Sequence, residues 1–135
     1  MRYVIVPKAT EKPVSYALAK KFKDGAYRLI VCAQTWITDY SNEQQVRQVI
    51  EEIKESIREF IAEFDKDEDE CYVVTTGSNL ATAIVCSLLT EAGIDFKLLV
   101  YEKKIETYVI VDWREETCSL KEPCYRVRST VVDEL

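Results

Sequence analysis

Three short polar stretches hold the residues of this sequence whose types and spacing could do chemistry. In chain order these residues are Lys8 and Thr10, then Gln34 and Trp36, then Thr76, Gly77, Ser78 and Asn79. They offer an ammonium group, hydroxyl and amide groups and one aromatic ring. Hydroxyl groups, backbone N–H groups and one positive charge suit an anionic group, and an aromatic ring suits a planar one. We expect the three stretches to form one ligand site.

The third stretch is the most specific of the three because it leads directly into a predicted helix. Free N–H groups and the helix dipole point outward at such a place and suit an anion. The alternative is that Ser78 or Asn79 only caps the helix, which alone would explain the residue types. The turn matches neither a Walker loop nor a GxGxxG fingerprint, so an ATPase and a dinucleotide enzyme lack their signature.

The other two stretches allow two interpretations each. Lys8 and Lys12 could supply the positive charge that the turn lacks, or each could be an ordinary surface lysine. Trp36 is either a stacking platform for a base or a lid over the core, and the lid is the favoured interpretation. Adjacent carboxylates such as Glu51 and Glu52 are interpreted as solvated surface rather than as a catalytic pair.

The absence of histidine limits the chemistry. It excludes histidine-based acid–base catalysis and Ser-His-Asp triads, and it removes most mononuclear zinc sites. No cluster of metal ligands is evident either, so we expect no metal and no cofactor.

The five cysteines form no CxxC pair, which leaves zinc ribbons and thioredoxin-like motifs without support. Free thiols are the default interpretation in the absence of a secretion signal. Scarce Asn, Gln and Met beside plentiful Glu and Lys is a composition typical of thermophile proteins, in which intracellular disulfides do occur. Cys118 and Cys124 are the candidate pair.

Charge and hydropathy restrict the partners and the location. The net charge of −6 disfavours binding to duplex nucleic acid, which requires many cations, but leaves a small anionic ligand open. No apolar run approaches the roughly 18 residues of a membrane span, and the first residues lack a signal-peptide core. We therefore expect a cytoplasmic protein that does not enter a membrane.

Strand and helix patterns alternate along the chain. Apolar runs predict strands at residues 2–7, 26–33, 71–75, 96–101 and 107–111, and the alternation of Tyr125, Val127 and Val131 indicates one more strand. Helical spacing follows Pro13, and a long amphipathic helix covers residues 41–64, with Ser41 and Gln44 spaced as a capping box. The helix at 80–92 is apolar nearly all round, so we expect it to be heavily buried and partly covered by a second copy in a homodimer.

This alternation predicts one α/β domain over residues 1–135: a three-layer, Rossmann-like, mostly parallel sheet with a C-terminal β-hairpin at one edge. In such a sheet, ligands bind outside the carboxyl ends of the strands. That rule places the three polar stretches at one edge.

The element order and the polar turn before a buried helix resemble the CRISPR-associated Rossmann-fold (CARF) sensor domains, in particular the small stand-alone ring nucleases. The resemblance covers residues 2–111 and depends on architecture more than on motif. It implies a homodimer that binds a small cyclic nucleotide, cyclic oligoadenylate, across its two-fold axis. Lys8 and Thr10 would fall in the first ligand loop of that family, and Thr76, Gly77, Ser78 and Asn79 in the second.

The resemblance also implies an activity. In ring nucleases, Lys, Ser or Thr groups hold the phosphodiester while the adjacent ribose 2′-hydroxyl attacks it without a metal, which gives Lys8 and Ser78 the catalytic positions. Many members carry a Gly-Gly-Thr turn where this chain has Gly77, Ser78 and Asn79. The alternative function is a non-catalytic accessory or viral regulator that acts through protein–protein contacts.

Overall fold

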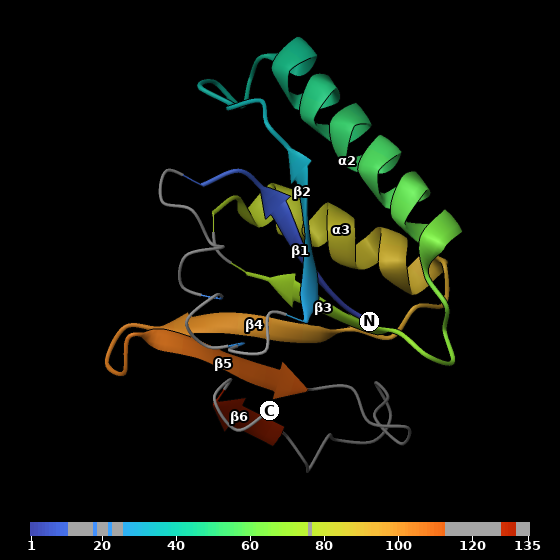
Figure 1. The fold of residues 1–135 in the computed structure, drawn as a ribbon. Coiled ribbons are helices and arrows are strands. Elements are labelled where there is room, and N and C mark those ends of the chain that lie inside the picture. Colours follow the sequence, from blue (N-terminus) through green and yellow to red (C-terminus); the bar gives the residue numbers. More distant parts are fainter. Residues whose placement is uncertain (11–17, 19–21, 23–25, 76, 113–127, 132–135) are drawn as a thin grey trace, which may run out of the picture.

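The computed structural model describes residues 1–10, 18, 22, 26–75, 77–112 and 128–131 (Figure 1). Its elements, in chain order, are β1 (Arg2–Lys8), β2 (Tyr27–Ala33), α2 (Glu43–Glu63), β3 (Glu70–Val74), α3 (Asn79–Glu91), β4 (Lys97–Glu102), β5 (Thr107–Asp112) and β6 (Arg128–Val131). Each of the five strands predicted with bounds is present, with ends that differ by one residue. The sixth, β6, contains Val131, while Tyr125 and Val127 lie outside the described residues. The helix predicted after Pro13 lies largely outside the described residues.

The strands form one mixed sheet in the order β2-β1-β3-β4-β5-β6. β1 pairs in parallel with both β2 and β3, and β3 pairs in parallel with β4. The pairs β4–β5 and β5–β6 are antiparallel. The chain therefore has the α/β class, the mostly parallel sheet and the antiparallel hairpin edge that its pattern predicts.

Side chains alternate across the sheet and form two apolar clusters. Tyr3 and Ile5 of β1 face the cluster that includes the buried side chains of α2 and α3. Val4 and Val6 face the opposite cluster, to which Leu18 and Phe22 belong. α2 and α3 thus cover the same face of the sheet (Figure 1).

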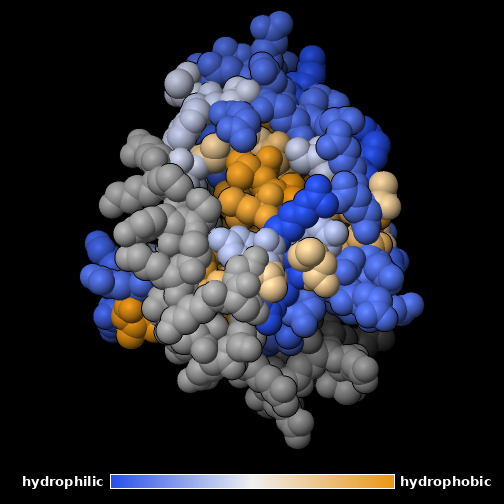
Figure 2. Space-filling view, viewed as in Figure 1, coloured by the Kyte–Doolittle hydropathy of each residue, from blue (hydrophilic) through white to orange (hydrophobic). Residues whose placement is uncertain are grey.

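The edge strand β2 is less covered than its neighbour β1. Its residues Leu29, Ile30 and Val31 are only half buried, whereas β1 is buried from Tyr3 onward. Figure 2 shows an apolar patch in the part of the surface where β2 lies.

The long amphipathic helix is confirmed as α2, which buries Val49, Ile53, Ile57 and Phe60. Its N-cap, however, is Asn42 and not the predicted Ser41. The Asn42 side chain accepts hydrogen bonds from the N–H groups of Gln44 and Gln45, at 3.1 and 3.2 Å. The hydroxyl of Ser41 donates instead to Asp39 at 2.6 Å. Both residues can cap a helix, and the bond to Asp39 uses the Ser41 hydroxyl within the preceding turn.

The expectation of a heavily buried α3 is wrong. Only Ala81, Val85 and Leu89 are buried, one residue per turn of the helix. Ile84 and Leu88 are half buried and Ala83 is exposed, because α3 meets the sheet and α2 on one side only. Within the described residues, no helix combines the length and apolar character needed to cross a membrane.

Candidate functional site at the carboxyl edge of the sheet

The three polar stretches meet at the carboxyl ends of β1, β2 and β3, as the sequence predicts. Lys8 pairs with Ala33 at the end of β2, and the Ala9 N–H donates to the Ala33 carbonyl at 2.8 Å. A methyl group placed on Gly77 would lie 3.6 Å from the Thr10 side chain. The segment after β1 is therefore bonded to the end of β2 and lies next to the turn before α3.

Lys8 is not a surface lysine. The residue is only 6% exposed, and its ammonium nitrogen lies 4.4 Å from the centroid of the Trp36 ring. Within the described residues the ammonium group makes no salt bridge or hydrogen bond. The face of the Trp36 ring attracts this cation, and no carboxylate within the described residues neutralises it. Lys8 is thus a positive charge available to an anionic ligand.

Trp36 does not act as a lid over the core, because 51% of the residue is exposed. The next residue, Ile37, packs against the core cluster instead. The favoured interpretation from the sequence was therefore wrong, because the loop turns its second apolar residue inward and its first outward.

The turn before α3 caps the helix, which is one of the two roles that the sequence suggested. Gly77 has φ +90°, a conformation that favours glycine. The Ser78 hydroxyl accepts from the Ala81 N–H at 3.2 Å and so caps the helix. Within the described residues, the N–H groups of Asn79 and Leu80 have no acceptor, as expected for the first turn of a helix. They remain donors for an anion, while Thr76 lies outside the described residues.

A row of polar side chains on α2 holds the loop that carries Trp36. Gln45, Gln48 and Glu52 are spaced by three or four residues, which puts them on one face of the helix. Glu52 Oε1 accepts from the N–H groups of Gln34 and Thr35, at 3.0 and 3.2 Å. Gln48 donates to the Thr35 hydroxyl. The side-chain oxygen of Gln45 accepts from the N–H groups of Thr38 and Asp39, and its amide also bonds to the Thr38 hydroxyl.

The sequence did not reveal that this row binds the loop, and Glu52 was expected to be solvated surface. In fact Glu52 Oε2 is buried without a hydrogen-bond partner in the described structure. Burial by itself would raise the pKa of Glu52, but hydrogen bonds from Thr35 and from the Gln34 N–H outweigh it, so the pKa is lowered. The carboxylate therefore stays ionised and fixes the loop. The only signal in the sequence was the Gln45, Gln48, Glu52 spacing itself.

The remaining predicted site residue, Gln34, is exposed, and its backbone N–H is the group that binds Glu52. Two of the described cysteines are poor nucleophiles. Cys32 and Cys71 are buried free thiols, and burial raises the pKa of each to about 12. Cys118 and Cys124 lie outside the described residues.

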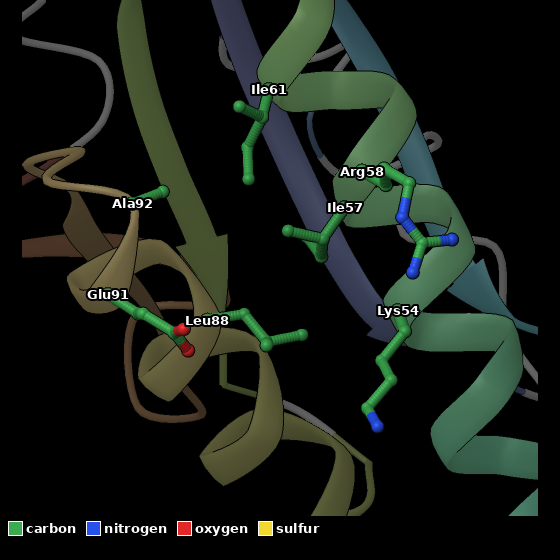
Figure 3. A pocket seen from close by; sticks show the side chains of 7 residues that line it. All are labelled: Lys54, Ile57, Arg58, Ile61, Leu88, Glu91 and Ala92. Carbon is green, nitrogen blue, oxygen red and sulfur yellow. The ribbon is translucent and has the colours of Figure 1, made fainter.

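A hollow of about 520 Å³ lies between α2 and α3 (Figure 3). Ile57, Ile61 and Leu88 line it, with Lys54 and Arg58 at the α2 side. Both cations are already paired, Lys54 with Glu51 and Arg58 with Glu55. None of the predicted site residues lines this hollow, so it is separate from the carboxyl edge.

Among the described residues, no group of three or more Cys, Asp or Glu side chains is arranged to hold a metal ion. Among these residues, the arrangement at the carboxyl edge is instead one largely buried lysine, one exposed indole and N–H groups of a helix N-terminus that have no acceptor. Comparisons of the chain with protein-family models, with curated proteins and with solved structures find no match.

Proposed function

We propose that this chain is a three-layer, Rossmann-like protein that binds cyclic oligoadenylate at the carboxyl edge of its sheet and opens the ring slowly without a metal. The observation that supports this most is the largely buried residue Lys8, whose ammonium makes no salt bridge or hydrogen bond within the described residues and which stands two residues before Thr10, the neighbour of Gly77. A phosphodiester carries one negative charge and two free oxygens. In this proposal it accepts from Lys8 and from the N–H groups of Asn79 and Leu80.

The chemistry requires positioning more than proton transfer by the protein. The 2′-oxygen attacks the adjacent phosphorus, the bond from phosphorus to the 5′-oxygen breaks, and the 2′-hydroxyl proton ends on that leaving oxygen. The products are a 2′,3′-cyclic phosphate and a 5′-hydroxyl. Lys8 and the backbone donors around Ser78 stabilise the charge that develops on the phosphoryl oxygens. This reaction needs no histidine, in keeping with the sequence.

The test uses Lys8→Ala and a matched lysine. Lys97 is exposed and lies at the start of β4, at the opposite edge of the sheet from the carboxyl ends of its parallel neighbours. Wild-type protein and Lys97→Ala should bind cyclic tetra-adenylate or cyclic hexa-adenylate in a calorimeter and gain melting temperature with it. Lys8→Ala should lose about 100- to 1,000-fold in the rate of ring opening, the usual cost of one electrostatic donor. Turnover should continue in a chelator.

Each failure has a separate meaning. Binding without ring opening would leave a sensor or a sequestering protein. An unchanged rate in Lys8→Ala would remove Lys8 from the site. No binding of either ring would favour the alternative, a regulator that acts through protein contacts.

A further inference from the structure

We infer that Trp36 is a stacking subsite for the nucleobase of the ligand, and that Glu52 positions it from beneath the loop. This inference rests on the proposed function, because it assigns the part of the same ligand that lies beside the phosphate. Its basis is the combination of an exposed ring, a cation against that ring and a loop that is held in place from α2.

The exposure of Trp36 is maintained by the structure around it. An indole gains free energy when it leaves water, so a pliable loop would fold its tryptophan onto the nearest apolar surface. Here the loop is fastened through the backbone N–H groups of Gln34 and Thr35 to Glu52, and those of Thr38 and Asp39 to Gln45. Trp36 stands between these two anchors and is held outward.

Lys8 further fixes the ring. Its ammonium lies 4.4 Å from the ring centroid and therefore occupies one face of the indole. About half of the Trp36 surface, 51%, remains open to a ligand. A planar heterocycle can stack there, and stacking on an aromatic side chain tolerates any base.

The neighbouring groups select the class of ligand. The same Lys8 that holds the ring is the charge proposed to meet the phosphate, and Thr10, two residues on, lies next to Gly77. A ligand that uses both the ring and the charge must carry a planar group and an anion a few bonds apart. Nucleotides carry both groups, whereas inorganic phosphate and sugar phosphates carry the anion without the planar group.

The experiment makes Trp36 the sole tryptophan with Trp113→Phe and follows its fluorescence during titration. Cyclic tetra-adenylate and AMP should quench it, whereas ribose 5-phosphate should not. In a calorimeter, Trp36→Leu should weaken cyclic tetra-adenylate binding by roughly 10- to 100-fold, as the usual worth of one stacked base implies, and Trp36→Phe should keep most of the affinity.

Glu52 is tested as a positioning residue. Glu52→Ala should weaken binding as Trp36→Leu does, and the double variant should be little worse than either alone, because both changes remove one interaction. Glu52→Gln should restore affinity, since an amide oxygen can accept the same two N–H groups. A merely structural role would instead lower the melting temperature and give additive losses.

The outcomes separate this inference from the proposed function. Tight binding of cyclic tetra-adenylate without quenching, and with full affinity in Trp36→Leu, overturns the stacking subsite alone. If the ring does not bind but millimolar AMP still quenches Trp36, the proposed function fails and the base subsite remains. If neither nucleotide quenches Trp36, the stacking subsite is wrong.

Discussion

The burial of Lys8 is a property that only the folded chain reveals. The sequence places a lysine after a β-branched run, and nothing in that run says whether the ammonium lies in water. Its burial depends on Trp36, which arrives from a different loop, and on the register that pairs Lys8 with Ala33. The position of Lys8 at a strand end could be predicted, but its burial required the three-dimensional pairing.

Gly77 offers a test at the same scale. Its φ of +90° disfavours any other residue, while the space around it is open, since a methyl group would lie 3.6 Å from Thr10. Gly77→Ala should therefore cost about 1–2 kcal/mol of stability through backbone strain alone. It should also weaken ligand binding, because relaxing the strain moves the N–H groups before α3. Chemical denaturation and calorimetry measure the two effects.

Gly93 is the matched control at the other end of α3. It has φ +72°, and a methyl group there would meet only the flexible end of Lys66, at 3.2 Å. Gly93→Ala should lose stability to a similar degree and keep the affinity for the ligand. Equal losses of affinity in both variants would mean that the turn at Gly77 contributes stability and nothing specific to the site.

At the scale of elements, the helix α2 was readily predicted from the sequence. The role of its residue Glu52, which binds the loop that carries Trp36, was not. Apolar residues at every third or fourth position are sufficient to identify the helix and its buried face. The polar face is different, because Glu52 resembles its solvated neighbours in type and spacing. Only the loop that folds back onto α2 distinguishes it, and loop paths depend on hydrogen bonds between residues remote in sequence.

The lowered pKa of Glu52 gives a prediction for the loop that α2 holds. A carboxyl whose pKa is lower in the folded protein stabilises the fold while it is ionised, above its ordinary pKa of about 4.3. That stabilisation is lost as the pH falls through the folded value, which lies below the ordinary one. Trp36 fluorescence in the Trp113→Phe background should therefore change in acid, before the helices melt in circular dichroism.

Glu52→Gln supplies the comparison, since its side chain does not titrate. The acid transition of Trp36 should be absent from this variant. A transition that persists unchanged would assign the effect to another carboxyl, such as Asp39, whose pKa is also lowered, by hydrogen bonds from Ser41.

At the scale of the whole molecule, the alternation of strands and helices was sufficient to predict the class and the parallel sheet. It did not give the strand order, because which strand lies beside β1 depends on contacts between segments far apart in the chain. The convergence of the three polar loops could still be predicted, because all parallel strands end at the same edge. The burial of α3 on one side only could not be predicted from the sequence, because it depends on where α2 lies.

The homodimer remains a prediction, and the exposed side of α3 is its expected contact. No charged residue occurs between Asn79 and Thr90, in a chain of net charge −6. Two copies that meet through this surface avoid the repulsion of their acidic surfaces. Light scattering should report a dimer at micromolar concentration, and Ala83→Arg, at an exposed position of α3, should give a monomer.

Ala62→Arg is the matched substitution on α2, where Ala62 is also exposed. It adds the same charge and the same bulk and should leave the dimer intact. A monomeric wild-type protein, or dimers that both variants preserve, would contradict a contact through α3.

The place of β1 between β2 and β3 has a consequence for how the chain folds. Residues 2–5 belong to β1, the first strand of the chain, yet their pairing on one side requires residues 70–73. In contrast, β4 and β5 join across a short local turn. Closing such a long loop is slow compared with forming a hairpin. The C-terminal half should therefore form structure first, while the apolar strand β1 waits with an open edge that another unfolded chain could pair with. Refolding yield should accordingly fall as protein concentration rises.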